Sequence, residues 1–110
     1  MTPEAKVKRH LKEQCEARGW QCLVLVDTVR KKWPDRTLIA SHGRIAFVEV
    51  KRTGAPMNDK HVQEQIKRIQ ELTALGFPAF LVEGNKGVDV MVSVLIGKGW
   101  PELYRDLPSA

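Results

Sequence analysis

Two carboxylates and one amine near the middle of the chain have the chemistry of a metal-dependent hydrolytic site. Asp35 follows a proline in a short turn, and Glu49 and Lys51 end an apolar run that reads I-A-F-V-E-V-K. Alternate side chains of a strand share a face, so Glu49 and Lys51 should point one way and Val48 and Val50 the other. Carboxylate oxygens suit Mg²⁺ or Mn²⁺, which keep several waters and take only one or two protein carboxylates.

Phosphodiester hydrolysis is the reaction that these groups suit best. It needs an activated water, neutralised charge on the phosphate and a stabilised leaving oxygen, and a bound metal contributes to each of these. Lys51 is placed to orient or deprotonate the water or to stabilise the transition state, and the carbonyl of Val50 offers a neutral oxygen ligand. On the strand alone, however, charges at its end are more simply explained as its exit from the core.

Other common catalytic sites are absent from the sequence. It has no glycine-rich phosphate loop, no His-x-x-x-His zinc pair and no nucleophile elbow. The three histidines are scattered, and each fits a surface position better than a ligand position. Cys15 and Cys22 match no common zinc spacing, and we expect them to be small buried hydrophobes in a reducing compartment.

Composition indicates one globular domain over 1–110, with a core over about 2–96 and a tail over 97–110. No apolar run approaches the roughly 20 residues of a membrane span, and the N-terminus lacks the apolar core of a secretion signal. We therefore expect a cytoplasmic protein that does not enter a membrane. The net charge of +5 suits binding to polyanions, although solubility alone explains it equally well.

Local patterns predict an α/β fold with four strands. The expected elements are a helix capped by Thr2 and closed by Gly19, strands over 21–26, 37–41, 44–50 and 78–83, and a second helix from a cap at Asn58 or Asp59 to about Leu75. His42-Gly43 is expected as a tight hairpin turn, and 84–87 as a turn. Residues 88–96 fit both helical and strand spacing, and we favour a helix because the sheet already has four strands.

Glu4 has two interpretations. It shares the inward stripe of the first helix with Val7 and Leu11, and in the first turn it complements the helix dipole. Alternatively, it leans over the sheet toward a metal. Without the other residues, the dipole role is the simpler one.

The central residues resemble the PD-(D/E)XK nuclease pattern: Pro34-Asp35, thirteen intervening residues, then Glu49-Val50-Lys51. Their finer form is similar to the VRR-NUC family, in which P-D-R, F-V-E-x-K and a downstream glutamine recur. Here these stand as Pro34-Asp35-Arg36, Phe47-Val48-Glu49-Val50-Lys51 and a glutamine in the next helix. One departure is Trp33, where the family usually has glycine, and we expect it to crowd the turn and line a DNA groove.

The resemblance implies a fold and a set of site residues. The fold is a PD-(D/E)XK restriction-endonuclease-like core of order α-β-β-β-α-β plus a C-terminal helix. The implied metal ligands are Glu4, Asp35, Glu49 and the backbone of Val50, and the implied catalytic set is Asp35, Glu49, Lys51 and Gln65. Gln65 is the best match to the motif glutamine because of its spacing to Gly76, with Gln63 as the fallback.

The resemblance also implies a function. Small stand-alone members of this family resemble Holliday-junction resolvases, which implies a homodimer that cuts branched DNA with Mg²⁺ or Mn²⁺. The alternatives are a less selective nickase or flap nuclease working with a helicase, and a basic nucleic-acid-binding domain without turnover. Basic residues flanking the site are expected to bind DNA: Arg30, Lys31, Lys32, Arg36 and Arg52.

Overall fold

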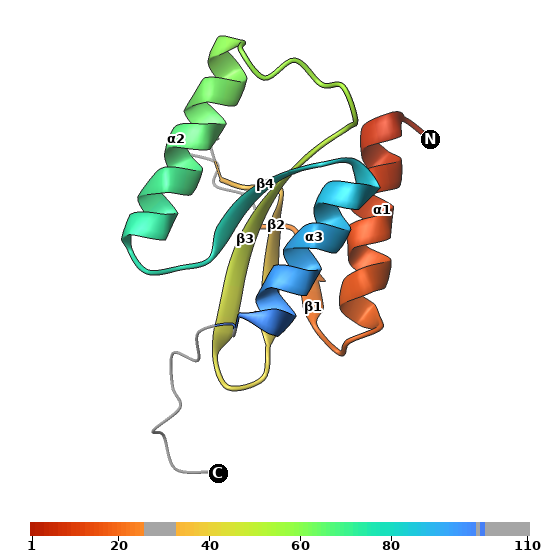
Figure 1. Ribbon diagram of the computed structural model, residues 1–110, viewed down its shortest axis with the longest axis vertical. Helices are drawn as coiled ribbons and strands as arrows, with labels where there is room; N and C mark the ends of the chain where they lie inside the picture. The colour runs from red at the N-terminus through yellow and green to blue at the C-terminus, as the bar shows by residue number, and fades with distance from the viewer. Residues whose placement is uncertain (26–32, 99, 101–110) are drawn as a thin grey trace.

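The computed structural model describes residues 1–25, 33–98 and 100, and its elements follow the predicted order (Figure 1). They are α1 (Pro3–Glu16), β1 (Gln21–Leu23), β2 (Arg36–Ala40), β3 (Arg44–Lys51), α2 (Lys60–Ala74), β4 (Ala79–Glu83) and α3 (Gly84–Gly97). Thr2 caps α1, and its hydroxyl accepts a hydrogen bond from Ala5 N at 3.1 Å. Asp59 caps α2 in the same way, through Val62 N at 2.8 Å.

The four strands form one sheet in the order β1-β2-β3-β4. β1, β2 and β3 make an antiparallel meander, whereas β3 and β4 run parallel. A parallel pair requires a crossover connection, which α2 supplies. β3 is therefore a central strand, and its charged end at Glu49 and Lys51 lies beside Leu81 and Glu83 of β4.

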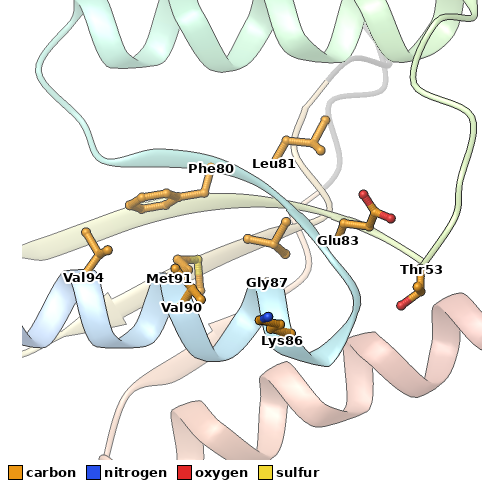
Figure 2. Close-up of a pocket in the computed structure, with 10 residues that line it drawn as sticks. Thr53, Phe80, Leu81, Glu83, Lys86, Gly87, Val90, Met91 and Val94 are labelled. Atoms are coloured by element: carbon orange, nitrogen blue, oxygen red, sulfur yellow. The ribbon is translucent and has the colours of Figure 1, made fainter.

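The outer side of β4 borders a pocket of about 540 Å³ that it shares with α3. Figure 2 shows apolar side chains along much of it, among them Phe80, Val90 and Val94. Neither Asp35 nor Glu49 lines this pocket. It is therefore separate from the predicted metal-binding residues.

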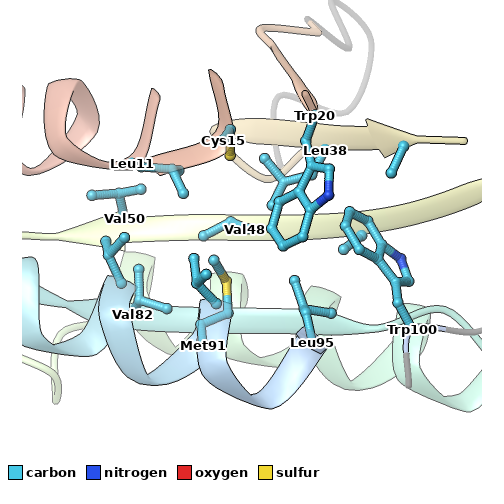
Figure 3. Close-up of a cluster of buried hydrophobic side chains, with 14 of the residues drawn as sticks. Leu11, Cys15, Trp20, Leu38, Val48, Val50, Val82, Met91, Leu95 and Trp100 are labelled. Atoms are coloured by element: carbon cyan, nitrogen blue, oxygen red, sulfur yellow. The ribbon is translucent and has the colours of Figure 1, made fainter. Parts of the chain in front are cut away.

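The main core lies between the sheet and the α1–α3 layer (Figure 3). Val48 and Val50 of β3 are fully buried there, packed with residues such as Leu11 of α1 and Met91 of α3. α2 covers the opposite face of the sheet (Figure 1). β3 thus sends its valines toward α1 and α3, and Glu49 toward α2, as strand alternation predicts.

Trp100 follows α3 and packs back onto the body of the protein. Its ring makes an edge-on contact with Trp20 at 4.7 Å between centroids, and the guanidinium of Arg44 lies 5.6 Å from it. Trp100 is 4% exposed. The rest of the tail, including Tyr104, lies outside the described residues.

The first strand is shorter than predicted. β1 ends at Leu23, while Val24 and Leu25 are 61% and 47% exposed. Leu23 pairs with Thr37, close to the start of β2 at Arg36, so the apolar run soon loses its pairing partner. The apolar pattern alone could not reveal this limit, because it depends on the neighbouring strand.

The remaining local predictions differ from the structure at one place. His42 and Gly43 form the β2–β3 turn with φ of 64° and 70°, as expected for a tight hairpin. The ambiguous segment is helical, as favoured, but α3 begins at Gly84 and so absorbs the predicted turn over 84–87. Gly84 has φ of 67°, and this conformation lets the chain pass directly from β4 into a helix.

Cys15 and Cys22 are both free. Cys15 is buried in the core and Cys22 packs against it, half-buried. A hydrogen bond between the two thiols raises the pKa of Cys15 and lowers that of Cys22. Among the described residues, no helix is long and apolar enough to cross a membrane.

Candidate active site

The Glu49 carboxylate is held by the backbone of Asp35, and the Asp35 carboxylate by the backbone of Val50, the residue after Glu49. Asp35 immediately precedes β2, and the β2–β3 register sets it beside the end of β3. Asp35 N donates to Glu49 Oε2 at 3.2 Å, and Val50 N donates to Asp35 Oδ2 at 3.0 Å. This reciprocal pairing fixes both acids at one end of the sheet.

Glu49 is 3% exposed, and α2 supplies its other partner. Gln65 Nε2 donates to Glu49 Oε1 at 2.7 Å, and Lys51 Nζ lies 3.9 Å from the same oxygen. Gln63 instead donates to the carbonyl of Met57 at 2.8 Å. The structure therefore brings Gln65, and not the fallback Gln63, to the carboxylate.

The pKa of Glu49 is raised from its ordinary value near 4.5 to about 8, chiefly because burial disfavours the charged form. The side chain and the negative charge of Asp35 contribute to the raised pKa, whereas the ammonium of Lys51 and the hydrogen bond from Asp35 N lower it. Two carboxyl groups this close repel each other when both are ionised. Without a cation, the pair therefore tends to retain a proton at neutral pH.

Lys8 is a member of the site that the sequence did not reveal. Its Nζ lies 3.7 Å from Glu4 Oε2 and 3.6 Å from Asp35 Oδ1. The Glu4–Lys8 spacing of one helical turn is visible in the sequence, but it is typical of an exposed ion pair. Only the fold brings Asp35 to the same ammonium.

The donor set fits a divalent metal of the Mg²⁺ class. Asp35 and Glu49 are two adjacent carboxylates, which is the number that Mg²⁺ usually takes. Gln65 Oε1 is buried and lacks a hydrogen-bond partner within the described part of the chain, so a polar acceptor is left for a water. Across those same residues, no three His, Cys, Asp or Glu side chains gather to hold a metal, so Glu4 does not form a cluster with the pair.

The comparisons with known proteins identify the fold. A solved structure described as a VRR_NUC domain is 31% identical, with a TM-score of 0.71, covering 84% of this chain and 97% of that chain. This chain belongs to the VRR-NUC domain family. The resemblance to this family, predicted from P-D-R and F-V-E-x-K, is therefore confirmed, as is the restriction-endonuclease-like fold. The chain is thus a member of a family of nuclease domains. No protein-family model and no curated protein matched the chain.

The basic residues of this VRR-NUC domain lie in different surroundings. Arg52 is exposed, and with Glu4 and Lys51 it lines a pocket of about 200 Å³ that extends to the start of α2. Arg36 donates to the carbonyl of Asp35 at 2.9 Å. The predicted DNA-binding residues Arg30, Lys31 and Lys32 lie outside the described residues.

Trp33 packs against the sheet on the α2 side. Its ring meets Phe47 edge-on at 5.2 Å, and the guanidinium of Arg68 lies 5.2 Å from its centroid. Its Nε1 lies 3.5 Å from the hydroxyl of Thr37. These contacts anchor the residue just before Pro34, and so support the turn that delivers Asp35.

We expect Glu49 to make the metal-free protein less stable as pH rises. A carboxyl whose pKa rises on folding stabilises the native state fully below its unfolded pKa, and this contribution is lost as pH rises from about 4.5 to about 8. Glu49→Gln keeps the shape without the charge. In urea titrations with chelator, the unfolding free energy of the variant relative to wild type should therefore increase with pH across that window.

Glu13→Gln is the matched control for this experiment, because Glu13 is an exposed α1 carboxyl paired with Arg9. Its unfolding free energy should follow the wild-type pH profile. A Glu49→Gln profile parallel to wild type would show that burial does not hold the Glu49 proton.

Proposed function

We propose that this VRR-NUC domain is a divalent-metal-dependent endodeoxyribonuclease that cleaves branched DNA as a homodimer. The observation that carries the proposal is the buried Glu49 carboxylate, held between Asp35 N and the Gln65 amide with Lys51 beside it. Membership of a nuclease-domain family supports the reaction type. The contacts around Glu49 support the assignment of roles to Asp35, Gln65 and Lys51.

Asp35 and Glu49 would hold Mg²⁺ or Mn²⁺, with the carbonyl of Val50 as a neutral ligand. When bound, the metal would lower the pKa of a water and polarise a phosphoryl oxygen. Glu4 stays a proposed additional ligand, supported by its place beside Lys51 and Arg52 in the pocket at the site.

Gln65 and the Asp35 backbone orient Glu49. Each hydrogen-bonds a different oxygen of the carboxylate, Oε1 and Oε2 respectively, so the carboxylate plane is fixed relative to Asp35. A carboxylate held in this way needs little reorganisation to bind a cation. This orienting role requires no contact between Gln65 and the substrate.

Lys51 is the residue we assign to the reacting phosphate. Its side chain is 11% exposed, and its ammonium lies 3.9 Å from Glu49 Oε1. Lys51 and Arg52 line the same pocket. From that position it can orient the attacking water and stabilise negative charge in the transition state. Arg52 and Arg36 would contact neighbouring phosphates, because both flank the carboxylate pair in the sequence and in the fold.

The dimer and the branched substrate are the finer parts of the proposal. One site cuts one strand at a time, so paired cuts in a symmetric junction require two copies related by a two-fold axis. The alternatives are a less selective nickase or flap nuclease, and a DNA-binding domain without turnover. The Asp35, Glu49 and Lys51 set favours an enzyme, since binding DNA alone does not require carboxylates at the phosphate.

Replacing Lys51 tests the enzyme assignment. Lys51→Ala should lower the rate of branched-DNA cleavage in Mn²⁺ by about 100-fold or more, because a charge that acts on the transition state is removed. DNA binding should change little, as other cations remain. Rates come from single-turnover gel assays, and binding from fluorescence anisotropy in Ca²⁺.

Lys98→Ala is the control for this charge change. Lys98 is exposed and caps the C-terminal end of α3. The N-terminal end of this helix is the one that follows Glu83, the residue of β4 that pairs with Lys51. The Lys98→Ala variant should cleave at the wild-type rate. Wild-type protein that binds DNA but never cuts it in either metal would leave the non-catalytic binding domain as the correct function.

A panel of substrates tests the branched-DNA preference. Labelled four-way junction, flap, fork and linear duplex should be cut at different rates, with the junction fastest and its two strands cut at symmetric positions. Size-exclusion chromatography with light scattering would give the mass of the active species. Equal cutting of all four substrates, or cutting by a monomer, would favour the less selective nickase.

A further inference from the structure

We propose that the Lys8 ammonium lies at the position beside Asp35 that a metal would take, and competes with the metal for that position. The inference rests on the proposed function, because it assumes that Asp35 binds a divalent cation. It assigns to Lys8 a role distinct from that of Lys51.

The two oxygens of Asp35 have different partners. Oδ2 accepts from Val50 N at 3.0 Å, which ties it to β3. Oδ1 faces Lys8 Nζ at 3.6 Å. A metal that binds Asp35 through Oδ1 would therefore meet the ammonium of Lys8.

Two lysine ammonium groups lie close to the carboxylates of the site. The carboxylates are those of Glu4, Asp35 and Glu49, and the last two are adjacent to each other. Lys8 lies between Glu4 and Asp35, while Lys51 lies beside Glu49. Removing Lys8 would take a positive charge away from Asp35, which would then attract an added cation more strongly.

A metal at Asp35 Oδ1 and the Lys8 ammonium would repel each other. Mg²⁺ binds oxygen at about 2.0–2.1 Å, and an ammonium near the same oxygen would then repel a double positive charge. Lys8 has a flexible stem and is 25% exposed, so it can withdraw. Glu4, one helical turn earlier, remains a partner for it at 3.7 Å.

The experiment measures Mn²⁺ affinity without DNA, so that it does not depend on catalysis. Metal-free protein is titrated with Mn²⁺, and the free ion is followed by electron paramagnetic resonance. Lys8→Met keeps most of the aliphatic stem and removes the charge. The dissociation constant should fall by about two- to fivefold, the effect expected from losing one partly exposed ion pair.

Two variants separate charge from structure. Lys8→Arg keeps the positive charge and should bind Mn²⁺ as the wild type does. Lys12→Met makes the same charge change one turn along α1, where the ammonium pairs with Glu16 at 3.9 Å, and it should leave the affinity unchanged. A disturbed fold would weaken metal binding, so tighter binding in Lys8→Met alone supports the competition.

Unchanged or weaker Mn²⁺ binding by Lys8→Met, in a protein whose wild type binds the ion, would overturn the inference and leave the proposed function intact. Failure of the wild type to bind Mn²⁺ would overturn both. The two failures are distinguishable because they occur in different proteins.

Discussion

Glu49 is a carboxyl group removed from water on a central strand, and the structure around it compensates for that removal. An ionised carboxylate in the interior is costly unless it is hydrogen-bonded and paired with positive charge. Its partners come from three places: the chain entering β2, helix α2 and β3 itself. The geometry of the site therefore depends on the position of each of these elements. Loss of any of the three contacts would leave the buried Glu49 carboxyl group with fewer partners.

The alternation of β3 explains how a chain of this size accommodates both a core and a site. Val48 and Val50 are buried on the face covered by α1 and α3, while Glu49 faces α2. A single strand thus separates apolar packing from polar chemistry. The site lies at the end of that strand, where a side chain from each helical layer reaches the carboxylates: Gln65 of α2 contacts Glu49, and Lys8 of α1 contacts Asp35.

The sequence revealed the parts of this arrangement that follow from strand geometry. Alternation placed Glu49 opposite the buried valines, and the family resemblance, through the spacing to Gly76, favoured Gln65 over Gln63. Lys8 was missed, because its contact with Asp35 depends on how α1 lies across the sheet, which no local pattern encodes. The packing of Trp33 between Phe47 and Arg68 and the early end of β1 were missed for the same reason.

The most direct test of the central claim is anomalous diffraction from crystals grown with Mn²⁺. We expect a strong anomalous peak in contact with the carboxylates of Asp35 and Glu49, with Gln65 still hydrogen-bonded to Glu49 and Lys8 withdrawn from Asp35. A peak held by other residues, or none at saturating Mn²⁺, would contradict the claim.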